Sequence, residues 1–220
     1  MKELIEFVKL SKYAGERFDL VQAGGGNLSI KLENGDMYIK ASGFSLSEAE
    51  IDKGHVIVNN LEVLKILENK EVLSELRNRN VCKAEMLMNN ITHNISNKPS
   101  IETFLHSLLY KYTLHTHPIA VNIIACKVGW REILAGIFPD ALLINYETPG
   151  ILLAVELKKS IIEYEKTYGK KPNIIMLQNH GLIVSSDSQD DIIEMMESVL
   201  LKIENYLCIN FEQYKLTNKL

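Results

Sequence analysis

An Asn-Gly pair between two short runs of alternating hydrophobicity is the feature that most constrains the fold. Residues 28–32 and 37–40 alternate between apolar and polar side chains, as strands with one buried face do. Asn34-Gly35 lies between the two runs, and this dipeptide suits the left-handed backbone of a tight hairpin turn. Residues 28–40 are therefore predicted to form a β-hairpin, with antiparallel pairing in at least this part of the sheet.

Helices and strands are predicted along the whole chain without strict alternation. Predicted helices cover residues 2–18, 82–95, 101–110, 119–127, 150–168 and 188–210, and further strands cover 55–58, 61–67, 112–117, 142–144, 173–177 and 182–184. This mixture favours an α+β fold or a mixed α/β sandwich, with helices packed on a largely antiparallel sheet. Because no repeat, low-complexity segment or flexible linker interrupts the pattern, residues 1–220 are predicted to form a single domain.

Charge and cysteine usage exclude several classes of partner. The net charge is −4 and no basic stripe is visible, which disfavours nucleic-acid binding. No segment approaches the roughly 18 uninterrupted apolar residues of a membrane span. The three cysteines, Cys82, Cys126 and Cys208, are far apart and form no CxxC pair. Together with an N-terminus that lacks an apolar signal core, they predict a cytoplasmic protein in a reducing compartment.

The tripeptide His115-Thr116-His117 is the strongest indication of chemistry. Residues i and i+2 of a strand face the same side, so both imidazoles can approach one cation while Thr116 points away. The third ligand is expected to be His180, which follows an apolar run and precedes a glycine. Three histidines that leave a coordination position open are typical of catalytic zinc. On spacing alone the alternative stays open that these histidines are only hydrogen-bonded in a half-buried strand.

A carboxylate and three further histidines were weighed for the same site. Glu102 is predicted at the start of a helix, where acidic residues are favoured by the helix dipole; a catalytic role is the other interpretation. His106 lies one turn further on the same face, and we favour a core or supporting role for it over metal ligation. His55 and His93 have no supporting pattern and are expected on the surface or in the core.

Five motifs occur in an order that resembles the class II aldolase/adducin family over about residues 1–208. They are Gly25-Gly26-Asn27-Leu28-Ser29, Lys40-Ala41-Ser42-Gly43, Pro99-Ser100-Ile101-Glu102, His115-Thr116-His117 and Asn179-His180-Gly181. The resemblance implies a three-layer α/β/α sandwich around a mixed, largely antiparallel central sheet. It also implies a homotetramer with the active site near the subunit interface, since the family's enzymes are commonly tetramers of this kind.

The resemblance further implies a division of roles among the motif residues. It implies that His115, His117 and His180 hold one Zn²⁺ per subunit and that Glu102 is the acid/base. The residues implied in binding a substrate phosphate are Gly26, Asn27, Ser42, Gly43 and Ser100; Lys40 is a further candidate, with a solvated strand residue as the alternative.

Two departures from the family pattern matter. Phosphate-binding members often have two consecutive serines before the glutamate, and here Ile101 replaces the second. The tyrosine that some aldolases bring from a neighbouring subunit has no clear match. A general acid is sought among Tyr146, Tyr206 and Tyr214, each of which is also a plausible packing residue.

The implied activity is that of a zinc-dependent lyase. It would cleave a C–C bond of a small, phosphorylated ketose through a metal-stabilised enediolate, giving dihydroxyacetone phosphate and an aldehyde. Glu102 would move a proton to or from the enediolate carbon. Decarboxylation of a 3-keto sugar-acid phosphate and 4-epimerisation of a pentulose phosphate stay open, although the epimerase branch carries Asp in place of Glu102. A non-catalytic, adducin-like interaction module is disfavoured because a scaffold has no use for an intact three-histidine set.

Overall fold

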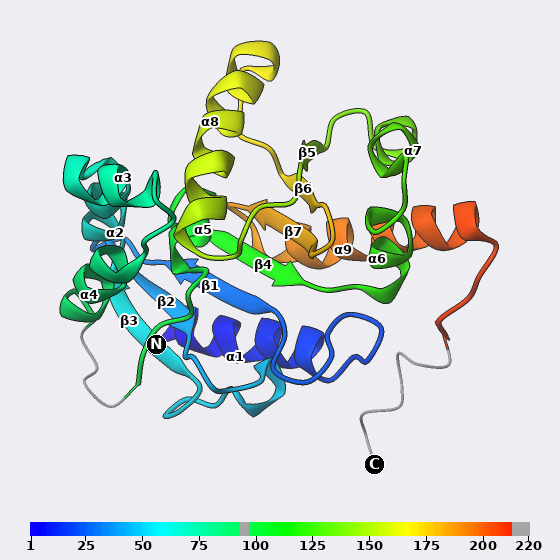
Figure 1. The fold of residues 1–220 in the computed structure, drawn as a ribbon. Helices are drawn as coiled ribbons and strands as arrows, with labels where there is room; N and C mark the ends of the chain where they lie inside the picture. Colours follow the sequence, from blue (N-terminus) through cyan, green and yellow to red (C-terminus); the bar gives the residue numbers. More distant parts are fainter. Residues whose placement is uncertain (93–96, 213–220) are drawn as a thin grey trace.

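The structure, a computed structural model, describes residues 1–92 and 97–212. Its centre is a seven-stranded sheet in the order β3-β2-β1-β4-β7-β6-β5 (Figure 1). The strands are β1 (Asn27–Lys31), β2 (Asp36–Lys40), β3 (His55–Asn59), β4 (Tyr112–Thr116), β5 (Leu142–Ile144), β6 (Ile174–Leu177) and β7 (Gly181–Ser186). β5 and β6 pair parallel and the other neighbours pair antiparallel. The sheet is therefore mixed and largely antiparallel, as predicted.

The predicted hairpin is confirmed as the pair β1 and β2. Ser29 lies opposite Ile39 in the antiparallel register. Gly35 in the turn has a φ of +88°, a left-handed conformation that favours glycine because it lacks a Cβ. β3 continues the meander on the far side of β2, so the N-terminal half of the sheet forms from strands close in sequence.

Helices cover both faces of the sheet, which makes the three layers. One face is covered by α1 (Lys2–Gly15), α6 (Ile119–Ala125), α7 (Trp130–Ile137) and α9 (Gln189–Leu207), and the short 3₁₀ helix η1 (Leu46–Glu48) packs against α1. The other is covered by α2 (Asn60–Glu68), α3 (Lys70–Leu76), α4 (Cys82–Asn90), α5 (Thr103–Ser107) and α8 (Ile151–Tyr168). The alternating side chains of β7 divide accordingly: Leu182 and Val184 join the first hydrophobic cluster and Ile183 joins the second.

Residues 61–67, predicted as a short strand, form most of α2 instead. The Asn59 side chain accepts a hydrogen bond from the backbone N–H of Glu62 at 3.1 Å and so caps the helix. Val63, Ile66 and Leu67 then fall on one face at helical spacing and are buried in the second cluster. The cap and this spacing explain why the segment is helical.

The helix predicted over 101–110 is reduced to α5, because both of its ends are held in other pairings. The Ser100 N–H binds the Lys40 carbonyl at 3.2 Å, which keeps the preceding chain beside β2. The Tyr110 N–H binds Ser185 Oγ at 3.0 Å instead of continuing the helix.

Two further helices, α3 and α7, were not predicted, and residues 93–95 of the helix predicted over 82–95 lie outside the described residues. No helix in the described part of the chain is long and apolar enough to cross a membrane.

Candidate metal centre

The predicted histidines meet at one edge of the sheet. In the register of β4, His115 lies opposite Asn27 at the start of β1 and opposite Ile183 of β7. His117 follows the last residue of β4, and His180 lies in the turn that connects β6 to β7. Because β7 runs antiparallel to β4, the turn before β7 reaches the same edge as the end of β4. Thr116 points to the opposite face, where its hydroxyl contacts Met196 Sδ.

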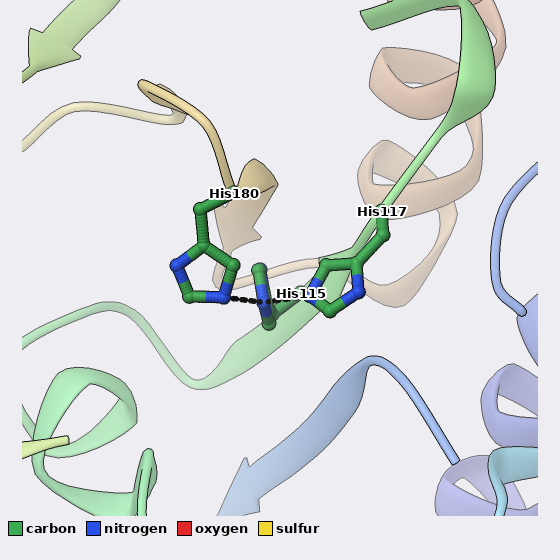
Figure 2. Close-up of side chains that lie close together, drawn as sticks. All are labelled: His115, His117 and His180. Carbon is green, nitrogen blue, oxygen red and sulfur yellow. Dashed lines mark hydrogen bonds between the residues drawn. The ribbon is translucent and has the colours of Figure 1, made fainter. Parts of the chain in front are cut away.

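The three imidazole rings present nitrogen atoms to one another (Figure 2). His115 Nε2 lies 2.9 Å from His117 Nε2 and 3.2 Å from His180 Nε2. One nitrogen of each ring belongs to a set whose members all lie within 4.8 Å of one another. The structure therefore places the three predicted ligands where they could hold one metal ion.

Hydrogen bonding alone does not account for this arrangement. His115 Nδ1 lies 3.0 Å from the Leu182 carbonyl oxygen, so Nδ1 carries the proton and Nε2 presents a lone pair. Two other ring nitrogens crowd that lone pair, which can accept only one well-aligned hydrogen bond. Two nitrogens bound to one tetrahedral zinc at about 2.1 Å would lie roughly 3.4 Å apart. The donor set and its spacing therefore fit a shared zinc-like cation.

Burial favours the neutral, ligating form of these histidines. It lowers the pKa of His115 to about 3, although the neighbouring Glu102 opposes this change. Burial and then the proximity of His180 lower the pKa of His117. A neutral imidazole is the form that binds metal ions.

One glycine in the loop before β1 and one at the start of β7 leave the space in which the His117 ring lies. A Cβ added at Gly25 would lie 2.9 Å from His117 Nδ1, and one added at Gly181 would lie 2.9 Å from His117 Cδ2. A Cβ at Gly181 would also lie 2.3 Å from the Thr116 carbonyl oxygen. Gly25 and Gly181 therefore make room for the His117 ring because neither has a Cβ.

Gly25→Ala is expected to weaken the binding of a metal ion, tested with zinc, about 10- to 100-fold, the usual effect of disturbing a group that positions a ligand. The added methyl would lie 2.9 Å from His117 Nδ1 and 3.0 Å from the Gln22 carbonyl oxygen, so the His117 ring is displaced, while Gly25 has no positive φ that would disfavour alanine. Gly24→Ala is the matched control, since its Cβ would meet no heavy atom within 4 Å. Zinc affinity is measured by competition with a chromophoric chelator. Equal affinities in the two variants would contradict this account of the His117 ring.

Glu102 brings a carboxylate to the same position. Its Oε1 lies 3.1 Å from His180 Nε2 and its Oε2 lies 3.7 Å from His115 Nε2. Burial alone would raise its pKa, but the attraction of His115 and the hydrogen bond with His180 together lower the pKa below the usual range. Asn27 Nδ2 donates a short hydrogen bond to Oε2. Glu102 is thus an oriented carboxylate anion beside the three ring nitrogens.

The residues predicted to bind phosphate fall into two groups. Ser42 and Ser100 lie on neighbouring segments, because Ser42 N–H binds the Lys98 carbonyl at 2.8 Å and Ala41 pairs with Pro99. These two serines line one cavity of about 260 Å³, beside the exposed Gly43. Gly26 and Asn27 are buried at the start of β1 instead.

Lys40 is buried rather than solvated. Its Nζ donates to the carbonyl oxygens of Gly24 and Phe44, and burial lowers its pKa. The ammonium group therefore ties the glycine loop before β1 to the loop after β2. It also acts electrostatically on Glu102 and His117, which places a positive charge near the histidine cluster.

The other two described histidines, His55 and His106, are not part of the ligand set. His106 is fully buried and its Nδ1 lies 2.8 Å from Ser29 Oγ, as expected of a core or supporting residue. His55 packs against the rings of Phe7 and Tyr38. His93 lies outside the described residues.

Of the three tyrosines weighed as general acids, Tyr146 and Tyr206 lie among the described residues, and neither hydroxyl group makes a hydrogen bond to the histidine cluster there. Tyr146 is exposed and follows β5, and its backbone N–H binds Gln178 Oε1 at 3.0 Å on the edge that carries His180. Tyr206 is exposed near the end of α9. Tyr214 lies outside the described residues.

Two supporting contacts were not predicted from the sequence. The Leu182 carbonyl sets the tautomer of His115, and a backbone carbonyl has no sequence signal. Asn122 Nδ2 donates to the His180 carbonyl at 3.2 Å and links α6 to the ligand turn. Asn122 lies inside a predicted helix, where a single asparagine gives no signal of a functional contact.

Comparison with known proteins identifies relatives of the whole fold. The profile of the family described as Class II Aldolase and Adducin N-terminal domain matches residues 5–206. The N-terminal class II aldolase domain of a conserved protein from Thermoplasma acidophilum is 25% identical, with a TM-score of 0.75 and 92% of each chain covered. None of the curated proteins matches the chain.

Two enzymes share the fold at lower identity. An L-fuculose 1-phosphate aldolase is 18% identical, with a TM-score of 0.64 and coverage of 99% of this chain and 95% of its own. A sugar-phosphate aldolase from Thermotoga maritima is 16% identical, with a TM-score of 0.64 and coverage of 94% and 95%. At these identities the likeness shows the three-layer fold, and the chemistry has to be argued from the site.

Proposed function

The chain belongs to the class II aldolase and adducin family, and on that premise we propose that it is a zinc-dependent lyase acting on a small phosphorylated ketose. The reaction would break a C–C bond and give dihydroxyacetone phosphate and an aldehyde. One observation carries the proposal: three histidine nitrogens and the Glu102 carboxylate converge on one position at the edge of the sheet.

His115, His117 and His180 would hold the ion, which when bound supplies Lewis-acid stabilisation of the negative charge that develops as the C–C bond breaks. Glu102 is placed to take a proton from the substrate and return it to carbon, since its carboxylate is the anion. Asn27 holds Oε2 by a hydrogen bond and leaves Oε1 on the side of His180, 3.1 Å from its Nε2. Asn27 therefore orients the base in this proposal.

The substrate phosphate is proposed to bind in the cavity that Ser42 and Ser100 line. Ser42, Gly43 and Ser100 would bind its oxygens, with Lys40 supplying positive charge behind the loop. Gly26 would serve by close packing, because a Cβ there would lie 2.9 Å from the His115 carbonyl oxygen. Ile101 is 57% exposed and lines the same cavity. An apolar side chain therefore occupies the position of the second serine in the family's phosphate-binding pattern.

We also propose that the protein acts in the cytoplasm as a homotetramer with the site near a subunit interface. The family supports this assembly, and the site supports it in one respect. No described tyrosine hydroxyl contacts the histidine cluster, so a neighbouring subunit is a natural source for the general acid. A non-catalytic adducin-like role is disfavoured by the complete ligand set.

Removal of the metal is expected to abolish activity. Dialysis against EDTA should leave no detectable turnover, and one equivalent of zinc should restore it. Borohydride added with substrate should not inactivate the enzyme. Borohydride would trap a Schiff base between the substrate and Lys40, a buried lysine of lowered pKa. Its addition therefore tests the alternative, lysine-dependent mechanism. Activity that survives chelation, or that borohydride destroys, would overturn the zinc-dependent mechanism.

The substrate is found by screening ketose 1-phosphates and sugar-acid phosphates. Dihydroxyacetone phosphate and carbon dioxide are detected separately, so that aldol cleavage and decarboxylation give different readouts. Pentulose phosphates are included with analysis of C4 configuration, which detects epimerisation. Dihydroxyacetone phosphate from one ketose phosphate supports the proposal, and carbon dioxide or an epimer without it would replace the proposal by the corresponding reaction.

A further inference from the structure

A second cavity, of about 540 Å³, lies at the edge of the sheet opposite to the histidines. It is lined by Lys31, Leu32, Glu33, Leu109, Tyr110, Lys111, Lys171 and Asp187. Lys31 ends β1 and Lys111 precedes β4, whereas Asn27 and His115 pair at the other ends of the same strands. Four residues of strand at about 3.3 Å each separate the two edges by roughly 13 Å. This cavity is therefore separate from the proposed active site.

The ammonium groups of Lys31 and Lys171 bind the carbonyl oxygens of two consecutive residues beside this cavity. Lys31 Nζ donates a short hydrogen bond to the Leu109 carbonyl oxygen, and Lys171 Nζ donates to the Leu108 carbonyl oxygen at 2.8 Å. The two acceptors belong to consecutive residues of the segment that follows α5. An ammonium group has three N–H donors, so each lysine keeps two that these bonds do not use.

The local charge is positive and incompletely balanced. Three lysines line the cavity, Lys31, Lys111 and Lys171, against the two carboxylates of Glu33 and Asp187. Asp187 lines the cavity, but its Oδ1 accepts a hydrogen bond from the Lys111 backbone N–H at 3.1 Å. Burial and then repulsion by Lys171 lower the pKa of Lys31 to about 7, against a smaller opposing attraction by Asp187. The effect of the Lys171 charge on the pKa of Lys31 is thus larger than the effect of the Asp187 charge.

We propose that this cavity is a binding site for a phosphate dianion or a small phosphate monoester, held between the Lys31 and Lys171 ammonium groups. A phosphate group carries up to two negative charges and three or more acceptor oxygens, which match two adjacent cations with spare donors. The cavity has room for more than the phosphate itself, since pockets of 300–1,000 Å³ are typical for small organic ligands. This site goes beyond the proposed lyase activity and does not depend on it.

Site-resolved protection of lysines tests the proposal. The zinc-loaded protein is treated with acetic anhydride at increasing concentrations of inorganic phosphate, and modification of each lysine is followed by mass spectrometry. We expect millimolar phosphate to slow modification of Lys31 and Lys171 at least fivefold and to leave Lys166, an exposed lysine of α8, unchanged. The same protection is expected after EDTA treatment, which separates this result from any failure of the proposed zinc chemistry.

Variants and other anions complete the test. Lys171→Met is expected to weaken phosphate protection of Lys31 about tenfold or more, because it removes a charge-assisted hydrogen bond. Lys171→Arg should retain protection, and Lys166→Met is the matched control. Glycerol phosphate distinguishes an ester from free phosphate by its relative affinity, and acetate should protect weakly. The proposal is overturned if phosphate protects Lys31 no more than Lys166, or if acetate protects Lys31 as well as phosphate does. It is also overturned if phosphate protects Lys31 equally in Lys171→Met and in the wild type.

Discussion

Glu102→Gln is expected to keep the metal and lose turnover. Glutamine has the same shape and retains a carbonyl oxygen for the Asn27 Nδ2 donor, so the buried contact survives. It cannot take a proton from the substrate, and losing a positioned acid/base costs about 10²- to 10⁴-fold in rate. We therefore expect kcat to fall by that factor while zinc content, measured by elemental analysis, stays at one ion per chain.

The control for Glu102→Gln removes the same charge elsewhere. Glu163→Gln lies on the exposed face of α8 and should retain both zinc and turnover. A second variant, Glu102→Asp, keeps the carboxylate but withdraws it by one methylene, so partial activity is expected. Wild-type turnover in Glu102→Gln would refute the role of this side chain as the base. Loss of zinc from the variant would instead assign Glu102 to the ligand set.

The N-terminal part of the sheet was predictable because its signals are local. The Asn34-Gly35 turn and the alternation on both sides depend on residues within one hairpin, and the register follows from which face is buried. The segment 61–67 was mispredicted because a short run of apolar residues fits a strand as well as a helix. The deciding information was the cap at Asn59 together with the spacing of Val63, Ile66 and Leu67.

The convergence of the three histidines was predictable for a different reason. Alternation along a strand places His115 and His117 on one side in any sheet, so two members of the set follow from period alone. His180 was chosen because it follows an apolar run and precedes a glycine, and the order of the five motifs agreed with that choice. The pairing of β7 with β4, which brings His180 to the same edge, is a tertiary fact that the sequence did not supply.

The supporting contacts could not be predicted, because they join residues distant in sequence through backbone atoms or amides. The resemblance implied phosphate binding by Asn27, which stays a prediction, and the structure adds a hydrogen bond from its amide to Glu102, 75 positions along the chain. Lys40 was weighed as a solvated residue, and only the fold shows its ammonium group enclosed by the carbonyls of Gly24 and Phe44. Such contacts depend on how loops meet after the sheet has formed.

His117→Ala is expected to lose both the metal and the activity while the fold is retained. His117 follows the end of β4, and its ring lies between two glycines rather than in a hydrophobic cluster. Removing it leaves two of three imidazole ligands, and Lewis-acid stabilisation worth several kcal/mol is lost with the ion. Since each 1.36 kcal/mol is a factor of ten in rate, turnover should fall by about 10³-fold or more. Elemental analysis should find zinc far below one ion per chain.

Two comparisons show whether that loss comes from the missing ligand. His55→Ala removes a histidine that packs against Phe7 and Tyr38, away from the other rings, and should keep zinc and turnover. Free imidazole added to His117→Ala, with excess zinc, should restore part of the activity because it fills the space left by the ring. The metal-free melting temperatures of wild type and His117→Ala should agree within a few degrees, since no hydrophobic core contact is removed. Stoichiometric zinc in His117→Ala would contradict the three-histidine site on which the proposed chemistry depends.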